Sequence, residues 1–265
     1  MDIPGGSRAH AGGRGVGLCT DVGRVRPNNE DAIMAVDVSA AAGSGRGRFL
    51  LLMVADGMGG CPRGEEASRI ALDSVAETVA SRLSDGARIG DIMADGIRNA
   101  NRDILVYARR HSESEGMGTT LVCALVAGDR VHLASVGDSR AYVVGGRIRQ
   151  VTRDHTHAQD LADRGLITAE ESRSHPGSCI LTRAVGMPGG AEPDMEMFDL
   201  GADESLLLCS DGVTAHLADH EILAAVSGRG AQDACRRVVD IANGRGGRDN
   251  VSLVMLSAVC GAGPW

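Results

Sequence analysis

The stretch FLLLMVADGMGG, Phe49 to Gly60, runs from an apolar β-strand into an acidic, glycine-rich turn. The same pattern recurs twice at strand ends, because SLLLC leads into Asp211 and Asp249 precedes VSLVML. A fourth acidic pair, Glu30-Asp31, follows a strand-and-turn pattern near the start of the chain. A strand end fixes a side chain, and the turn beside it leaves room for a ligand. We therefore expect these carboxylates to meet at one site.

Gathered carboxylates repel each other unless a cation lies between them. Oxygen ligands of this kind suit a hard divalent ion such as Mg²⁺ or Mn²⁺. Each turn also has a simpler interpretation, because Asp-Gly and Asp-Asn are ordinary turn formers. That interpretation is preferred for any single turn, and it weakens when three strand ends carry the same signal.

Seven short motifs follow one another along the chain in a specific order. They are TDVGRVRPNNEDA (Thr20–Ala32), ADGMGG (Ala55–Gly60), GTTLV (Gly118–Val122), VGDSRAY (Val136–Tyr142), LTRAVG (Leu181–Gly186), CSDGV (Cys209–Val213) and RDNVSLV (Arg248–Val254). This series resembles the metal-dependent serine/threonine protein phosphatases of the type 2C or PPM family, and the chain looks most similar to their compact bacterial members. The resemblance covers nearly the whole chain, from near residue 15 to near residue 258.

The resemblance implies a metal centre with two Mn²⁺ or Mg²⁺ ions and a third, weaker ion. Its ligands would be Asp56, which bridges the two main ions, the carbonyl of Gly57, Asp211 and Asp249 on the first ion, Glu30 on the second largely through water, and Asp138 on the third. Asp31 and Asn250 would lie behind these ligands and orient them or their waters.

Asp56 and Arg26 are the expected catalytic residues. In the family's reaction, water activated by the two ions attacks the phosphate monoester in line, without a phosphoenzyme. Arg26 would bind the substrate phosphate, because a planar guanidinium matches its geometry. The alternative for Arg26 is a surface arginine that pairs with Glu30 or Asp31.

Two positions depart from relatives in the family. Met58 stands where eukaryotic members carry a histidine proposed as general acid, although bacterial members often have Met there. Cys61 stands where bacterial members commonly have His, and we expect it not to be catalytic. A reactive thiol at a helix start and an inert buried cysteine both remain open for Cys61. His155, in VTRDHTHAQDL, resembles a family segment beside the active site.

Composition limits the class of protein. The 265 residues are 43% hydrophobic and carry a formal net charge of −8, which argues against a nucleic-acid or anionic-membrane partner. No residue is Lys, which excludes a Walker-type phosphate loop. The seven cysteines form no C-x-x-C pair, which suits a reducing cytosol. No signal peptide or membrane span is visible, so we expect a cytoplasmic monomer.

Hydrophobic periodicity predicts strands and helices in a mixed order. Strands are expected at 31–38, 49–56, 119–127, 130–136, 140–144, 147–151, 195–200, 205–210 and 250–258, and helices at 63–83, 88–110, 218–227 and 231–243. The resemblance implies an α+β fold, a four-layer α-β-β-α sandwich of two antiparallel sheets flanked by helices. We expect residues 1–15 to be a flexible tail and residues 16–260 to form one domain, with a polar flap at about 153–180.

The expected activity is hydrolysis of phosphoserine and phosphothreonine on proteins, opposing Ser/Thr protein kinases. Two alternatives belong to other classes. The first is a catalytically inactive module that binds phosphoproteins, which is disfavoured because every expected ligand position holds a competent residue. The second is a hydrolase of small phosphoesters on the same fold, which the flap sequence does not exclude. Turnover of a phosphopeptide with manganese separates the three.

Overall fold

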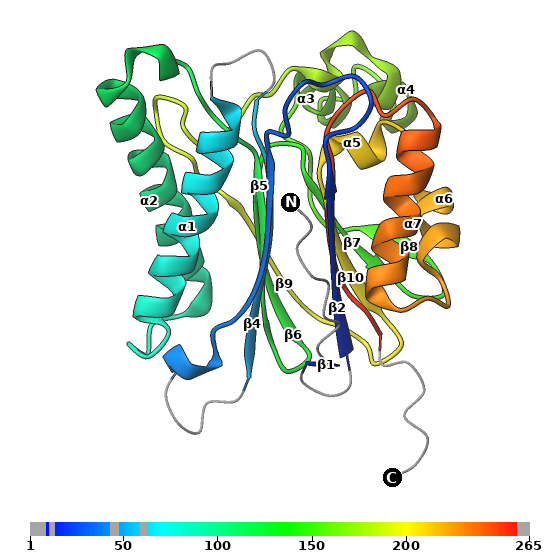
Figure 1. Cartoon of the computed structure of the whole chain (residues 1–265), viewed down its shortest axis with the longest axis horizontal. Coiled ribbons are helices and arrows are strands. Elements are labelled where there is room, and N and C mark those ends of the chain that lie inside the picture. Colours follow the sequence, from blue (N-terminus) through cyan, green and yellow to red (C-terminus); the bar gives the residue numbers. More distant parts are fainter. Residues whose placement is uncertain (1–8, 11–13, 43–47, 59–62, 259–265) are drawn as a thin grey trace.

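The computed structural model describes residues 9–10, 14–42, 48–58 and 63–258. Two β-sheets lie face to face and helices cover their outer faces (Figure 1). One sheet has the strand order β3-β4-β5-β6-β9 and the other β1-β2-β11-β10-β7-β8, and all pairs are antiparallel. The expected α-β-β-α sandwich of two antiparallel sheets is confirmed.

The strands mostly match the ranges expected from the sequence. The five-stranded sheet contains β3 (Asp31–Asp37), β4 (Phe49–Asp56), β5 (Leu121–Ala127), β6 (Arg130–Val136) and β9 (Asp194–Asp199). The six-stranded sheet contains β1 (Ala9–His10), β2 (Arg14–Asp21), β11 (Val251–Leu256), β10 (Ser205–Cys209), β7 (Arg140–Val144) and β8 (Ile148–Gln150).

Helices form the two outer layers and the flap. The five-stranded sheet is covered by α1 (Gly64–Arg82) and α2 (Ile89–Arg110), and the other sheet by α5 (Asp211–Thr214), α6 (Asp219–Val226) and α7 (Ala231–Gly244) (Figure 1). The flap holds α3 (His157–Asp163), α4 (Ala169–Ser174) and a 3₁₀ turn, Pro176–Cys179. Two further 3₁₀ turns are Ser39–Ala42 and Ser112–Ser114.

Strand β4 shows how the sequence builds three apolar layers. Successive side chains of a strand point to opposite faces. Leu51, Met53 and Ala55 accordingly pack with α1 and α2, whereas Leu50, Leu52 and Val54 face the second sheet. Both faces are buried, so FLLLMVA is a continuous apolar run without polar alternation. The same alternation directs Asp56, the last residue of β4, toward the layer between the sheets.

The first strands were not expected from the sequence. Residues 1–15 were assigned to a tail, but β2 begins at Arg14, and Ala9–His10 pairs with it as β1. Arg14 is only 4% exposed, and its guanidinium donates to the carbonyls of Leu200, Gly201 and Glu204. An arginine with this many buried acceptors has a structural role.

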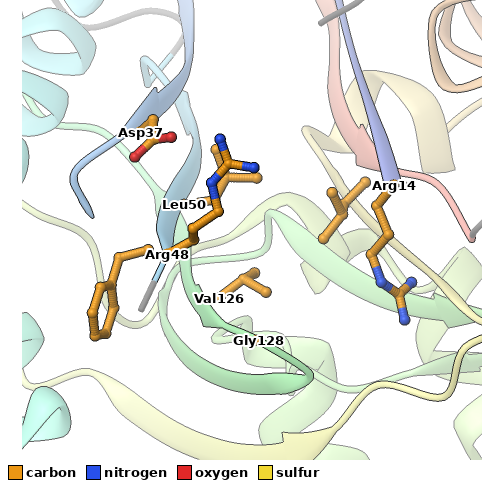
Figure 2. Close-up of a pocket in the computed structure, with 8 residues that line it drawn as sticks. Arg14, Asp37, Arg48, Leu50, Val126 and Gly128 are labelled. Carbon is orange, nitrogen blue, oxygen red and sulfur yellow. The ribbon is translucent and has the colours of Figure 1, made fainter. Parts of the chain in front are cut away.

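A small hollow lies between the sheets at the end where β2 and β4 begin. Arg14, Leu50 and Val126 are among its lining residues (Figure 2). The Arg14 guanidinium already donates to backbone carbonyls, so it is not available to bind a phosphate. This hollow therefore lies at one end of the core and is not the expected phosphate site.

Within the described ranges, none of the helices is both long enough and apolar enough to traverse a bilayer.

The contact between β2 and α7 yields a stability prediction. A Cβ added at Gly17 would lie 2.4 Å from the carbonyl carbon and oxygen of Ala231, at the start of α7. Gly17→Ala should therefore lower the free energy of unfolding by about 2–3 kcal/mol, because two backbones must move apart. Gly146→Ala, where a Cβ would meet nothing within 4 Å, should change it by less than about 0.5 kcal/mol. Urea unfolding of both variants measures the difference, and equal midpoints would contradict it.

Candidate metal centre

The expected acidic residues lie at one end of the layer between the sheets. Asp31 and Asp56 are directly opposite each other in the β3–β4 register. Ile33 and Ala35, which share the Asp31 face of β3, pack into the inter-sheet layer. The Asp31 and Asp56 carboxyls therefore extend that layer at its open end, where the apolar side chains stop.

The remaining carboxyls reach this end from other elements. Asp211 is the first residue of α5, directly after β10, and Asp249 lies just before β11. Asp138 follows β6 in the turn to β7. Asp56 interacts electrostatically with Asp31, Asp211 and Asp138, and Asp211 with Asp249. The sequence motifs thus gather five aspartates from distant segments.

Two threonines directly before β5, Thr119 and Thr120, hold the backbone of Asp56. The Asp56 carbonyl accepts hydrogen bonds from the Thr120 amide at 2.8 Å and from the Thr119 hydroxyl at 2.9 Å. The Thr120 hydroxyl in turn accepts from the Asp56 amide at 3.1 Å. GTTLV therefore supplies a rigid seat for the Asp56 side chain.

Gly57 allows a close approach of three segments. Its amide donates to the Glu30 carbonyl at 3.1 Å. A Cβ at Gly57 would lie 2.6 Å from the backbone of Gly64 and 2.7 Å from the Glu30 carbonyl oxygen. Only glycine fits here, so the start of α1 can lie against Glu30.

Asn250 ties the N-terminal motif to the C-terminal one. Its side-chain oxygen accepts from the Glu30 amide at 2.8 Å, and its Nδ2 donates to the carbonyls of Val22 and Asn28, each at 2.9 Å. These three bonds fix the backbone on both sides of Arg26 and at Glu30. The expected positioning role of Asn250 is supported by this geometry and stays a prediction.

Arg26 meets Asp249. Its Nη2 donates to Asp249 Oδ2 at 2.7 Å, while Asp249 Oδ1 accepts from the Asn250 amide at 2.9 Å. The sequence alternative was a pair with Glu30 or Asp31, and the carboxylate that binds Arg26 is a different one. The Arg26 side chain is 38% exposed, so its guanidinium lies at the mouth of the cluster.

Burial and mutual repulsion raise the pKa of the clustered carboxyls. For Asp56, burial acts first and Asp31 second, and the pKa lies well above its usual value. Burial, then Asp211 and Asp154, raise the pKa of Asp138 to about 8. Burial is also the main cause that raises the pKa of Asp31 to about 7. These directions mean that bare carboxylates are unfavourable here, so that a cation placed between them would be stabilising.

The donor set fits a hard divalent ion. Asp31 Oδ1 is buried without a hydrogen-bond partner, whereas Asp31 Oδ2 accepts from the Ser210 hydroxyl at 2.9 Å. The donors of the cluster are oxygens, mainly of carboxylates, as Mg²⁺ and Mn²⁺ prefer. As the side chains stand, no three His, Cys, Asp or Glu of the described residues form a ready-made metal-binding group. Asp56 and Asp211 are buried next to each other, and each raises the cost of a negative charge in this cluster, which a cation between them would lower.

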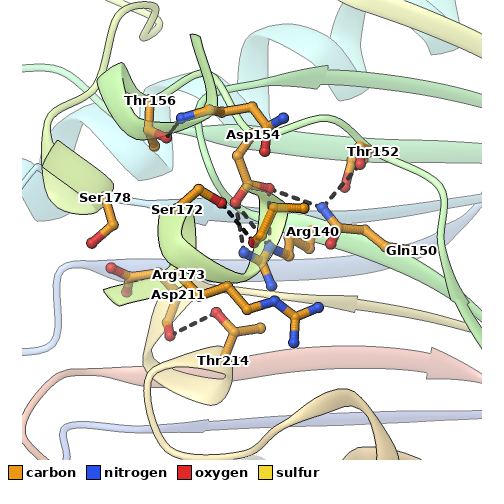
Figure 3. Close-up of polar contacts among 12 residues, drawn as sticks. Arg140, Gln150, Thr152, Asp154, Thr156, Ser172, Arg173, Ser178, Asp211 and Thr214 are labelled. Atoms are coloured by element: carbon orange, nitrogen blue, oxygen red, sulfur yellow. Dashed lines mark hydrogen bonds and ion pairs between the residues drawn. The ribbon is translucent and has the colours of Figure 1, made fainter. Parts of the chain in front are cut away.

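A polar pocket opens beside the cluster, between the flap and the α5–α6 turn. Asp138 is among its lining residues. Asp211, Thr214 and Arg173 line it as well (Figure 3). Arg140 lies in its wall and makes a two-pronged ion pair with Asp154. The sequence analysis did not predict this pair. The one available signal was that Arg140 is the only basic residue in the motif VGDSRAY.

His155 joins the base of the flap to the Asp138 turn. The side chain is fully buried, and its Nδ1 accepts from the Gly137 amide at 3.0 Å. Its Nε2 therefore carries the proton and lies 3.0 Å from Asp194 Oδ2. Burial lowers the pKa of His155, with Asp194 opposing, so the ring is a neutral linker at pH 7.

Of the two positions that depart from the family, the structure describes Met58 but not Cys61. The Met58 amide donates to the Gly118 carbonyl at 3.0 Å, and its methyl group fills the space that a Cβ at Gly118 would need. Cys61 lies outside the described residues, so its expected non-catalytic role stays a prediction.

The raised pKa values predict a pH dependence of the chelated protein. An aspartate whose pKa is higher in the folded state contributes stability that is fully present below the unfolded value of about 4 and is lost as pH rises through the folded value. With Asp31 near 7 and Asp138 near 8, the melting temperature in EDTA should fall between pH 5 and pH 8.5. Asp138→Asn should flatten this fall. Equal slopes for both proteins in calorimetry would count against it.

Comparison with known proteins agrees with this geometry. Residues 28–232 match the family model of protein phosphatase 2C. The serine/threonine protein phosphatase PstP of Mycobacterium tuberculosis is 36% identical over 91% of this chain, which spans 44% of the length of PstP. The serine/threonine phosphatase stp of Listeria monocytogenes is 34% identical over 89% of this chain and 93% of its own length.

A solved structure is similar over most of the chain. The catalytic domain of PstP in complex with 2 manganese ions superposes with a TM-score of 0.77, at 33% identity, over 91% of this chain and 96% of that one. The matched family model covers the segments that carry Glu30, Asp56, Asp138 and Asp211. By motif order, by fold and by these matches, the chain belongs to the protein phosphatase 2C family.

Proposed function

We propose that this protein hydrolyses phosphoserine and phosphothreonine esters on other proteins in the cytoplasm, as a monomer, and so opposes Ser/Thr protein kinases. The observation that carries the proposal is the gathering of Asp31, Asp56, Asp138, Asp211 and Asp249 at one open end of the sandwich, with Arg26 at its mouth. Related chains named as serine/threonine phosphatases support the substrate class.

Divalent ions would be held by Asp56, Asp211 and Asp249, with Glu30, the Gly57 carbonyl and Asp138 as further ligands. When bound, such ions supply Lewis acidity, which makes water a nucleophile at neutral pH and neutralises phosphoryl charge. Mn²⁺ and Mg²⁺ both suit these oxygens, and the manganese in the similar PstP structure favours Mn²⁺. The many carboxylates of the cluster support two main ions and a third ion at Asp138.

Arg26 has two partners in this proposal, Asp249 in the metal-free protein and the substrate phosphate in the active one. Without metal its guanidinium neutralises Asp249. If Asp249 held a divalent ion, Arg26 would lose that partner, and its planar donors would be free for the substrate phosphate. The same ion pair therefore holds the arginine next to the site before substrate arrives.

The other residues of the site keep these groups in place. Asn250 fixes Glu30 and the loop that carries Arg26, and Thr119 with Thr120 fixes Asp56. Asp31 lies behind Asp56, where its Oδ2 is oriented by Ser210. Rigid support of this kind keeps reacting groups aligned with the phosphate.

The pocket beside the flap favours a protein substrate over a small ester. It is an open, polar surface that runs from Asp138 and Asp211 to Ser178 and Asp219. A small phosphoester needs only the carboxylate cluster and Arg26, whereas a polypeptide on both sides of a phosphorylated residue also needs such a surface. The inactive binding module remains the weaker alternative, because every expected ligand is present.

The first test is metal-dependent turnover. The wild-type protein should dephosphorylate a phosphothreonine peptide with Mn²⁺ or Mg²⁺, and chelation should abolish turnover. Asp56→Asn and Asp211→Asn should abolish it too, while their metal-free melting temperatures hold or rise, because one repelling charge is removed. Asp233→Asn, on the exposed face of α7, is the matched control and should keep full activity. Full activity in EDTA would end the metal hypothesis.

The second test concerns Arg26. Arg26→Ala should raise KM for a phosphopeptide and lower kcat, because a charge-assisted hydrogen bond of about 1.5–3 kcal/mol is lost, so kcat/KM should fall by tens of fold. Metal-free Arg26→Ala should also melt at a lower temperature, because Asp249 loses its partner. Arg237→Ala, exposed on α7, serves as control. Wild-type kinetics in Arg26→Ala would show that Arg26 only pairs with Asp249.

A further inference from the structure

Two arginines face the pocket beside the carboxylate cluster, and they differ in how their donors are used (Figure 3). Arg140 is committed: its guanidinium binds Asp154 through Nε and Nη2 and donates to the Tyr142 hydroxyl through Nη1. Its side chain is only 16% exposed. Arg140 is therefore part of the wall.

Arg173, on α4 of the flap, is largely free. Its side chain is 56% exposed, and its Nη2 donates to Asp219 Oδ2 at 3.0 Å. Within the described part of the chain, no acceptor binds its Nε or Nη1. An arginine has five N–H donors in a fixed fork, so most of the hydrogen-bonding capacity of Arg173 faces the pocket unused.

A chain of hydrogen bonds fixes where Arg173 stands. Arg140 Nη1 donates to the Tyr142 hydroxyl at 3.0 Å, and that hydroxyl donates to Asp219 Oδ1 at 3.4 Å. Asp219 is the first residue of α6, where the helix dipole favours a negative charge. Both Asp219 oxygens are thus in use, and the aspartate anchors Arg173 from the rigid side of the pocket.

We propose that Arg173 is a specificity-determining residue that binds a carboxylate of the protein substrate near the phosphorylated residue; this rests on the proposed function. One prong of the guanidinium stays on Asp219, and the free edge accepts an Asp or Glu side chain in the two-pronged geometry typical of arginine and carboxylate. Among the carboxylates that line the pocket, Asp154 and Asp219 are already paired with arginines, and Asp138 and Asp211 belong to the cluster that would hold the cation, so they are not free to bind a basic side chain.

The experiment compares phosphothreonine peptides that carry Asp, Asn or Arg at each position flanking the phosphorylated residue. The wild-type protein with Mn²⁺ should show kcat/KM about threefold to fivefold higher for the best Asp peptide than for its Asn counterpart, mainly through KM, as expected for a partly exposed ion pair. Arg173→Ala should abolish this ratio, and Arg173→Glu should favour the Arg peptide. Turnover of p-nitrophenyl phosphate should be unchanged in both variants.

Arg164→Ala is the matched control, because Arg164 is an exposed flap arginine outside the pocket lining. It should keep the wild-type ratio. The proposal is overturned if Arg173→Ala keeps the preference for Asp, or if the wild-type protein has none. If the wild-type protein turns over neither the phosphopeptides nor p-nitrophenyl phosphate, the proposed function fails. Fluorescence anisotropy with the same peptides bearing a phosphonate then still tests Arg173, because the Kd values of the Asp and Asn peptides should differ by the same ratio.

Discussion

The site depends on the cost of placing several carboxyls where the apolar layer between the two sheets ends. Asp31 and Asp56 continue the same strand faces that bury Ile33 and Val54, so they cannot turn away from the core without breaking the strand alternation. Burial and proximity then raise their pKa values and those of Asp138 and Asp211. The fold holds this repulsion in place because the strands are stabilised elsewhere, by three layers of buried apolar side chains. A bound cation would offset the repulsion that the fold imposes on these carboxyls.

Much of this could be predicted from the sequence, and for physical reasons. FLLLMVA and SLLLC are apolar on both faces, so they belong to central strands, and an Asp directly after such a run has a fixed position. A helix was expected at 63–83, and Ala67, Ala71, Val75 and Val79 follow helical spacing and belong to the buried face of α1. The order of the acidic motifs indicated the family, and the structure places the sheets and helices accordingly.

The sequence was less informative where long-range partners decide the structure. Strand β2 carries glycines and a buried arginine, so it lacks the apolar alternation of an ordinary strand; its stability comes from pairing with β11 and from carbonyls near Leu200. The alternative considered for Arg26 was a pair with its neighbours Glu30 or Asp31, whereas its carboxylate partner, Asp249, lies 223 residues away. The anchoring of Arg173 by Asp219 is also invisible in one dimension, because 46 residues separate them.

The clamp formed by Asn250 has a consequence for how the protein is made. It joins Glu30 to a residue 220 positions later, and β2 pairs with the last strand, β11. During synthesis β11 must leave the ribosome before the two halves of the site can meet, since the N-terminal segment emerges first. Pairings of such long sequence separation also form slowly. A nascent or truncated chain that lacks β11 therefore has Asp56 and Glu30 but no closed site, so activity depends on synthesis having passed β11.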